Sequence, residues 1–469
     1  MNQVKNMKKT VLAIVVITLI LLSLPGCAVE EAALPGYAGT MEGYSWYHTQ
    51  ERDRAWEEDV LFLADKFLDE HPFLSGKPVT VETCAGLTKT VRYSLSTETY
   101  NEALREAFLE QVNDLIVRIP QLSDEGILYE MQSLIAGLED AHSFLGIRTG
   151  EILPVFFEPV FEGEQAAFLA VRAPEEHQDI LGCILTAIND ISIEEIVENL
   201  SPYVSCENAY GLAYKLADPD SYTLLTQKSA LQHIGVLEPD AESAELTFET
   251  ENGSEKRTMG MVSYSAYEHM KMVSHPMVSE QMPRFQKDGN YWCEALSENV
   301  LYIRLRVMQQ DDAYPLYRLL TDVRSILENQ EAPQRVVIDF RDNLGWDSYR
   351  SEMTSLASML NQYKTDGVYV VINGKCLSAG VIVPYMLTAA IDEAQLIGTP
   401  AGQFVNFCMN NISYSLPNAG NPFWIPRQYY RGAPYCRCDA LYPEITVRQT
   451  WEDFLSGEDS VMKYILAVD

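Results

Sequence analysis

The feature that most constrains the fold is an alternation of short apolar runs with amphipathic segments from Val300 onward. Strands are predicted at 301–307, 336–340, 368–372 and 394–397, with helices between them. In the first strand the apolar residues alternate with Tyr302, Arg304 and Arg306, which predicts a half-buried strand. Strands that alternate with helices form a largely parallel sheet, and ligands bind at the carboxyl ends of its strands. Polar residues at those ends are therefore the first candidates for a site.

The rest of the chain divides into regions of different character. Residues 52–148 carry helical stripes, and Ser123 is a plausible N-cap for the last helix. Residues 149–262 read as short strands and turns, with a capping box at Ser192 to Glu195 that suits a small module of the PDZ kind. A linker is expected at 263–298 and an α/β core at 299–469. The predicted fold class is a multidomain protein that mixes α+β and α/β parts.

The N-terminus has the parts of a secretory signal. Lys5, Lys8 and Lys9 precede an apolar run at 11–24, which ends in Leu-Pro-Gly-Cys27. The run is shorter than the roughly 20 residues of a membrane span, although a short transmembrane anchor is the alternative. We therefore expect a lipoprotein with a signal peptide at 1–26, a lipid on Cys27 and a tether at 27–51. Two acyl chains give stable membrane anchoring, so the protein is expected on the outer face of the cell membrane or in the periplasm.

Charge and cysteine usage narrow the partners. The formal net charge is −33 at pH 7, and a surface this acidic repels phosphate backbones, so no nucleic acid is expected as a partner. The nine cysteines include no CxxC pair and no histidine at zinc spacing, so neither a metal site nor a cofactor is predicted. Export permits disulfides, and the pairing stays open.

Ser378 lies between a predicted buried strand and an apolar helix, in the segment Asn373 to Gly380. Free amides and the helix dipole at such a position stabilise a developing negative charge, as acyl transfer requires. The alternative is an ordinary N-cap, for which serine is a preferred residue. Cys376 stands where the nucleophile elbow G-x-S-x-G needs glycine, so that motif is excluded.

These pieces, taken in order, resemble the family of tail-specific (C-terminal-processing) and tricorn-core serine peptidases. The resemblance spans roughly residues 100–469 and implies a ClpP/crotonase-like α/β core with a PDZ-like insert. It rests on Val337 to Trp346, similar to V-I-D-x-R-x-N-x-G-G; Val370 to Gly380, similar to the strand and S-A-G turn of the nucleophile; Leu396 to Gly402; Leu416-Pro417-Asn418; Leu138 to Phe144, similar to L-x-D-x-H-T; and Gly182 to Leu200, similar to the PDZ-like insertion.

The resemblance implies a serine mechanism with a histidine base. The processing branch uses a lysine about 25 residues after its serine, but Gln403 occupies that position and no lysine occurs between Ser378 and Lys463. The tricorn-like branch takes its base from the end of the helical region, where His142 stands. His142 is then general base and acid, Ser378 is the nucleophile, and the backbone amides of Gly345 and Ala379 form the oxyanion hole.

Two residues depart from the family pattern. Trp346 replaces the usual second glycine, and Ala141 replaces the serine that precedes the histidine in the tricorn-like pattern. No residue is assigned to orient His142, although Asp140 is close in sequence.

The predicted function is a cell-surface or periplasmic serine endopeptidase that cleaves protein or peptide substrates. One alternative is a catalytically weak lipoprotein that binds peptides or hydrophobic ligands through lining aromatic residues, and another is a non-peptidase acyl hydrolase such as an esterase. The candidate lining residues are Trp346, Trp424, Tyr429 and Tyr430.

Overall fold

The computed structural model describes residues 49–468 except 85, 88, 148–149, 164, 218–223, 279–281, 298, 330–334, 364 and 435. The expected signal peptide, the lipidation site Cys27 and nearly all of the expected tether lie outside the described residues. Among the helices that are described, none has the length and apolar character needed to cross a membrane.

The helical region begins with α2 (Gln50–Glu70), followed by α3 (Glu102–Arg118) and α4 (Asp124–Ala136). Of the stripe predicted on α3, which is Leu104, Phe108, Val112 and Leu115, the last three residues are buried and Leu104 is half-buried. Ser123 is the N-cap of α4, as predicted, since its hydroxyl accepts a hydrogen bond from the Gly126 N–H at 2.9 Å. The chain leaves α4 towards His142, so this helix sets where the candidate base lies.

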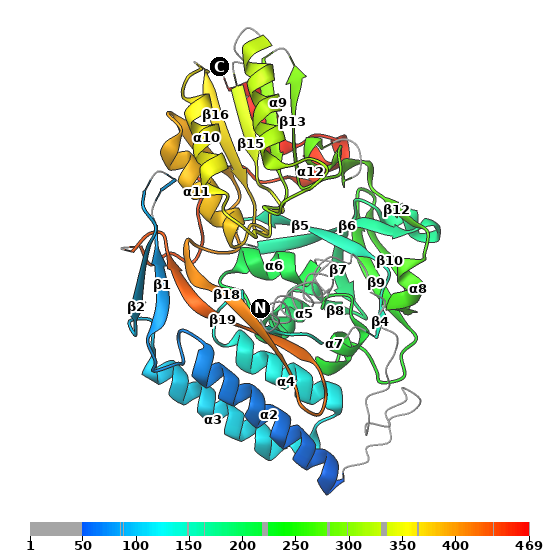
Figure 1. Ribbon diagram of the computed structural model, residues 1–469. Coiled ribbons are helices and arrows are strands. Elements are labelled where there is room, and N and C mark those ends of the chain that lie inside the picture. Colours follow the sequence, from blue (N-terminus) through cyan, green and yellow to red (C-terminus); the bar gives the residue numbers. More distant parts are fainter. Residues whose placement is uncertain are drawn as a thin grey trace, which may run out of the picture. The chain divides into compact units, whose positions relative to one another are not determined.

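A five-stranded sheet joins strands that are distant in the sequence (Figure 1). Its order is β18 (Asn406–Ser415), β19 (Pro422–Arg431), β1 (Val79–Thr83) and β2 (Arg92–Ser96), and β3 (Phe144–Leu145) pairs with β19. The pairing of β3 with β19 holds the segment after α4 against the C-terminal part of the chain. His142, two residues before β3, therefore meets residues of β18.

A seven-stranded antiparallel sheet carries the middle of the chain. Ser192 caps α5 (Ile193–Leu200) through the Glu195 N–H, as the capping box predicted. Residues 263–298 contribute one strand to this sheet and one to the next. The strands are β5 (Phe156–Glu162), β6 (Gln165–Pro174), β7 (Ile184–Ile188), β8 (Ile191–Ser192), β9 (Ser243–Thr250), β10 (Gly253–Gly260) and β12 (Met272–Ser274); β4 (Glu151–Ile152) and β11 (Val262–Ser263) pair separately, and the short helices are η3 (Ser201–Tyr203), α6 (Ala209–Ala217), α7 (Lys228–His233) and α8 (Tyr264–Glu268).

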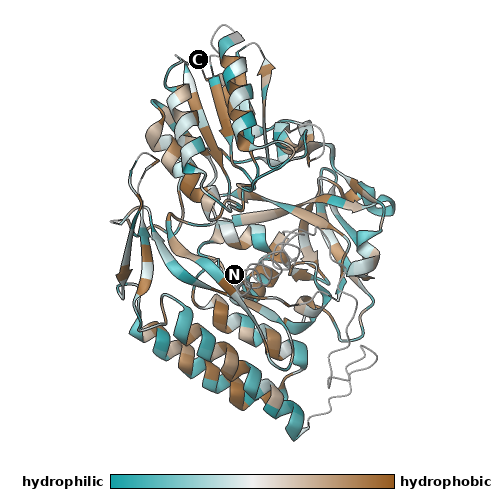
Figure 2. Ribbon diagram, in the orientation of Figure 1, coloured by the Kyte–Doolittle hydropathy of each residue, from teal (hydrophilic) through white to brown (hydrophobic). Residues whose placement is uncertain are grey.

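The predicted parallel sheet is confirmed. β13 (Tyr291–Ser297) is antiparallel to β14 (Val300–Leu305), after which β15 (Arg335–Asp339), β16 (Gly367–Ile372), β17 (Ala394–Gly398) and β20 (Ile445–Thr446) run parallel. One face packs on α9 (Leu316–Asn329), α10 (Arg350–Leu360) and α11 (Ala379–Ala390), and the other on α13 (Ser460–Ala467), which follows α12 (Trp451–Ser456). Figure 2 shows the apolar colour concentrated on β15 and β16.

The prediction that β14 is half-buried was wrong, because all six of its residues are buried. The sheet is covered on both faces, so the residues that alternate with the apolar ones also lie inside. Tyr302 donates its hydroxyl to Asp339 at 2.6 Å, and the Arg304 guanidinium contacts Asp339 and Asp342. Burial of the Tyr302 hydroxyl and of the terminal guanidinium nitrogens of Arg304 is therefore compensated by these partners.

Candidate active site

Ser378 lies where β16 has ended and α11 begins, but it is not an ordinary N-cap. An N-cap residue has an extended backbone and a side chain that accepts a hydrogen bond from the helix. Ser378 has φ 55° and ψ −123°, and its side chain makes no capping hydrogen bond. Such a conformation costs about 1–3 kcal/mol in a residue other than glycine and is concentrated at functional sites. Ser378 thus occupies the N-cap position of α11 without capping the helix through its side chain, and the hydroxyl is left for another role.

Two loops meet backbone to backbone at Ser378. A Cβ on Gly380 would lie 2.1 Å from the Asn343 carbonyl oxygen, and one on Gly345 would lie 2.7 Å from the Ser378 Cβ. The Leu377 N–H donates to the Asn343 carbonyl at 3.0 Å. Only glycine permits approaches this close. The resemblance to N-x-G and S-A-G segments thus has a physical reason, since each glycine makes room for the other loop.

The two predicted oxyanion donors differ in whether their N–H group already makes a hydrogen bond. The Ala379 N–H, at the first position of α11, makes no hydrogen bond to another described residue. The Gly345 N–H donates to Asn343 Oδ1 at 2.8 Å, while the Gly345 carbonyl accepts from Met308. Gly345 can therefore act as a donor only if its N–H exchanges the Asn343 oxygen for a substrate oxygen.

Trp346, which stands where the resemblance implies a second glycine, has a backbone conformation that favours glycine. Its φ is 117°, a value that residues other than glycine rarely adopt, and its side chain is exposed, with the residue 70% accessible to solvent. Its bulk therefore projects into solvent next to the serine loop and does not fill the loop. Leu344, two residues before it, is 44% exposed.

Side chains of neighbouring residues hold His142 in place. Its ring stacks on Phe407 of β18, with centroids 5.2 Å apart and planes at 4°, and its carbonyl accepts from Asn411 at 2.7 Å. Burial lowers the pKa of His142 below its ordinary value, although the Asp140 carboxylate opposes the shift. The preceding Ala141 is buried, and its carbonyl accepts from Lys215 at 3.1 Å. The imidazole is therefore neutral near pH 7, as a general base must be.

Asp140 does not orient the His142 ring. Its Oδ1 accepts the His142 backbone N–H at 3.2 Å but lies 4.0 Å from the ring Nδ1, which is too far for a hydrogen bond. Its Oδ2 accepts from Ser143 at 2.6 Å and from His71 Nε2 at 3.3 Å. Burial raises the pKa of Asp140, but its hydrogen bond and electrostatic interaction with His71, together with His142 and Ser143, act against burial, and the pKa is lowered. This carboxylate is therefore hydrogen-bonded to His71 and to the turn at residues 142 and 143, and not to the His142 ring.

Gln403 brings the serine and the histidine together. Its side-chain oxygen accepts the Ser378 N–H at 2.8 Å, and its amide nitrogen lies 3.3 Å from His142 Nδ1. Gln403 is fully buried and lies just beyond the carboxyl end of β17. Within the described part of the chain, the Ser378 hydroxyl makes no hydrogen bond to His142. The predicted pair is thus linked through one amide group.

Glu207 completes this group from the other side. It lies between η3 and α6, and its carboxylate accepts from the Gln403 amide nitrogen at 2.5 Å. Burial raises the pKa of Glu207 to about 8, although the hydrogen bond from Gln403 opposes the shift. Glu207 therefore holds its proton through most of the neutral range.

A second buried cluster lies behind His142. His71, Asp140 and Cys408 place one ligand-type atom each within 4.8 Å of one another. The Phe73 N–H donates to His71 Nδ1 at 3.2 Å, so the proton of the neutral ring is on Nε2 and points at Asp140. A histidine that binds a metal through Nε2 instead donates from its other nitrogen. The hydrogen bonding thus fits a histidine–aspartate pair.

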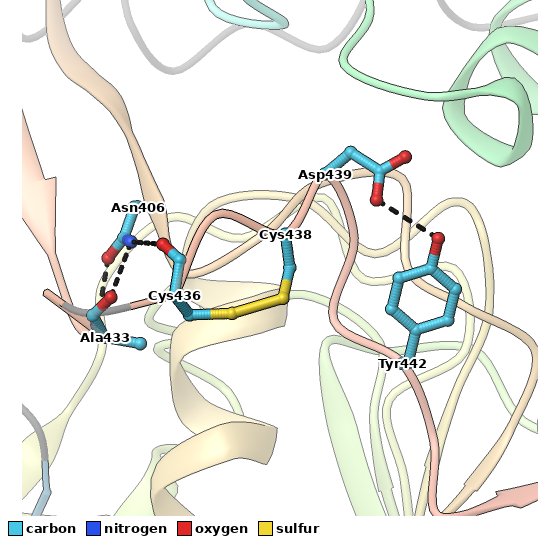
Figure 3. Close-up of a disulfide and its surroundings, with 6 residues drawn as sticks. All are labelled: Asn406, Ala433, Cys436, Cys438, Asp439 and Tyr442. Carbon is cyan, nitrogen blue, oxygen red and sulfur yellow. Dashed lines mark hydrogen bonds between the residues drawn. A yellow bond between two sulfur atoms is a disulfide. The ribbon is translucent and has the colours of Figure 1, made fainter.

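The structure answers the open question of cysteine pairing for one pair, Cys436 and Cys438, with Cα atoms 5.7 Å apart (Figure 3). Asn406 fixes this loop, because its amide donates to the Ala433 and Cys436 carbonyls at 2.8 and 3.3 Å. The six other cysteines in the described part of the chain are free. The same loop continues to Leu441, whose N–H donates to the Gln403 carbonyl at 3.1 Å, so it supports the segment that carries Gln403.

Comparisons with solved structures show which fold the chain has. No protein-family model matches the chain, and no curated protein sequence matches it. The structure of mature CPAF in complex with lactacystin matches with TM-score 0.59 at 10% identity, covering 88% of this chain and 97% of that one. Mature CPAF alone matches with TM-score 0.58 at 10% identity, covering 88% and 96%. The photosystem II D1 C-terminal processing protease matches with TM-score 0.37 at 10% identity, covering 83% and 92%. The chain therefore has the fold of mature CPAF.

Proposed function

We propose that the protein is a serine endopeptidase that cleaves protein or peptide substrates through an acyl-enzyme on Ser378. The observation that carries this proposal is the strained backbone of Ser378 at the start of α11, with His142 linked to it through Gln403. Strain of this kind persists only where the surrounding structure enforces it. An ordinary helix start does not need it.

In the proposed mechanism His142 takes the proton of the Ser378 hydroxyl as the oxygen attacks the scissile carbonyl. The negative charge of the tetrahedral intermediate is stabilised by the free N–H of Ala379 and, after its exchange, by that of Gly345. The imidazolium then gives its proton to the leaving amine, and water hydrolyses the acyl-enzyme with His142 again as base. The lowered pKa of His142 supports its role as a base at neutral pH.

Substrate binding and location are part of the same proposal. The insert at 149–262 is proposed as a PDZ-like module on the ClpP/crotonase-like core, and its strand β7 with the capped helix α5 supports this assignment. Such modules bind an extended peptide by strand addition. We also propose that Cys27 carries a lipid that anchors the protein to the outer face of the membrane.

A second candidate is a lipoprotein on this scaffold that binds peptides and cleaves them slowly or not at all. The internal hydrogen bond of the Gly345 N–H favours it, since one oxyanion donor is occupied. Of the aromatic residues expected to line a ligand site, Tyr430 is buried and Trp424 stacks on Phe144 with ring centroids 4.4 Å apart. The exposed Trp346 is thus better placed to contact a ligand than either of these.

Cleavage of unfolded casein and of a peptide library tests the proposal. The Ser378→Ala and His142→Ala variants are expected to lose cleavage, and full activity in either one contradicts the mechanism. Ser355→Ala, on the exposed face of α10, and His177→Ala are matched controls and should cleave like the wild type. Retention of intact peptide that is unchanged in Ser378→Ala, without cleavage by the wild type, would favour the second candidate.

A further inference from the structure

The orientation of the Gln403 amide follows from its partners. The Ser378 N–H is a donor, so the atom that it meets must be the carbonyl oxygen Oε1. The NH₂ group is thereby directed to the two remaining partners, the Glu207 carboxylate and His142 Nδ1. The reverse orientation of the amide would place its NH₂ group against the Ser378 N–H, with two donors facing each other. The contact with the Ser378 N–H thus fixes the orientation, and the contacts with Glu207 and His142 are compatible with it.

This arrangement determines the tautomer of the histidine. The Gln403 NH₂ group can form a hydrogen bond with His142 Nδ1 only if Nδ1 accepts, so the neutral ring must carry its proton on Nε2. Both ring nitrogens are then occupied, Nε2 by its proton and Nδ1 by the hydrogen bond from the Gln403 NH₂ group. A nitrogen that already holds a proton cannot accept one from a serine hydroxyl. A Ser–His pair works with the opposite tautomer, which an acceptor at Nδ1 normally enforces.

We propose that Gln403 is a positioning residue that keeps neutral His142 protonated on Nε2, and thereby suppresses proton transfer from Ser378 until its amide leaves Nδ1. The inference rests on the proposed function and deepens it, since it names the residue that sets the activity of the same site. Sequence position alone marked Gln403 only as the residue that stands in the lysine slot of the processing branch.

The substitution Gln403→Glu should reverse the effect. A carboxylate at this position accepts the Ser378 N–H as the glutamine does, and it also accepts a hydrogen bond from His142 Nδ1–H. The proton of the ring is then on Nδ1, and the Nε2 lone pair takes the Ser378 hydroxyl proton. The resulting imidazolium lies beside a negative charge, and it later gives the Nε2 proton to the leaving amine. Glu207, which holds a proton near pH 7, can donate it to the new carboxylate in place of the lost NH₂ contact.

The first test is the rate at which a fluorophosphonate labels Ser378 in the whole chain. Gln403→Glu is expected to react at least tenfold faster than the wild type, because the wrong tautomer lowers kcat by up to roughly 10⁴ in the serine-protease template. Gln403→Met, which removes the donor without adding an acceptor, is expected to react more slowly than Gln403→Glu. Gln362→Glu, an exposed glutamine after α10, is the charge control and should match the wild type. A folded Gln403→Glu variant that reacts more slowly than the wild type overturns the proposal.

The second test does not depend on activity. Nitrogen NMR of the whole ¹⁵N-labelled chain distinguishes the two neutral tautomers, and the His142 signals are identified by their loss in His142→Asn. The wild type is expected to carry its proton on Nε2, and Gln403→Glu on Nδ1. A wild-type proton on Nδ1 overturns the inference. If the wild-type proton is on Nε2 but no variant labels at Ser378, the proposed function fails while the assignment of Gln403 stands.

Discussion

The serine side and the histidine side of the site are held in different ways. Ser378 lies on a loop whose position is set by backbone contacts, with the Asn343 carbonyl bound by Leu377 N–H and glycines at the points of closest approach. His142 is held by side chains, which are the Phe407 ring, the Asn411 amide and the Gln403 amide. A backbone contact changes only when the loops themselves move, whereas each of these side chains can be replaced singly. The position of the nucleophile is therefore fixed by the architecture, and the state of the base is adjustable.

Removal of the Arg341 guanidinium should destabilise the serine side more than the other substitutions described below. Its buried guanidinium contacts Asp339 at 2.6 Å and Asp459 at 2.8 Å, and it thereby joins the end of β15 to the start of α13. Arg341→Met removes the guanidinium from Asp459 and leaves Asp339 with only the side chains of Tyr302 and Arg304. Breaking a buried ion pair in this way typically costs about 3–5 kcal/mol of unfolding free energy. Urea unfolding measures this loss. Arg324→Met, at an exposed position of α9, should change stability by less than about 0.5 kcal/mol, and an equal loss in both variants contradicts the role of the buried network.

Gly380→Ala tests the backbone contact between the two loops. The added Cβ meets the Asn343 carbonyl oxygen at 2.1 Å, so the loops must separate. A displacement of about 1 Å at a reacting group lowers the rate roughly 100-fold, and we expect fluorophosphonate labelling of Ser378 to fall by about this factor. Gly76→Ala is the matched control, because a Cβ there meets nothing within 4 Å. Unchanged labelling in Gly380→Ala would show that the serine position does not depend on this approach.

The Glu207→Gln variant tests the histidine side through the pH dependence of the unfolding free energy. Because the pKa of Glu207 is raised to about 8, the unfolded state loses its proton near pH 4.5 while the folded state keeps it. The contribution to stability is full below pH 4.5 and is lost as pH rises to about 8. The unfolding free energy of Glu207→Gln should therefore fall less between pH 5 and 8 than that of the wild type, by about 3 kcal/mol. Parallel pH profiles of the two proteins would contradict the raised pKa.

Trp346→Gly should produce the smallest effect. The substitution removes a strained backbone conformation but frees the unfolded chain, so the unfolding free energy should change by about 1 kcal/mol or less. Retained labelling of Ser378 is expected, because the exposed indole does not fill the loop. A complete loss of labelling in a folded Trp346→Gly protein would show that the side chain itself holds the serine loop.

The two sides also differ in how far the sequence predicts them. The strand alternation, the N-x-G and S-A-G segments and the caps at Ser123 and Ser192 are local patterns, and each predicted its element or its contact. The full burial of β14 was missed, because the helix α13 that covers its second face lies more than 150 residues later.

On the histidine side, the roles of Glu207, Phe407 and His71 come from contacts between segments that are distant in the sequence. No local sequence pattern predicts these contacts. Gln403 carried one signal, its position 25 residues after Ser378, which excluded a lysine base but gave no indication of the bridge to His142.

The central claim is that Ser378 is a nucleophile activated by His142, and mapping of a covalent adduct tests it most directly. The whole protein is treated with a fluorophosphonate, digested and analysed by mass spectrometry. The account predicts one modified residue, Ser378, with labelling that is faster in Gln403→Glu and abolished in His142→Ala. Labelling at another serine, or labelling of Ser378 that is unchanged in His142→Ala, would contradict the account.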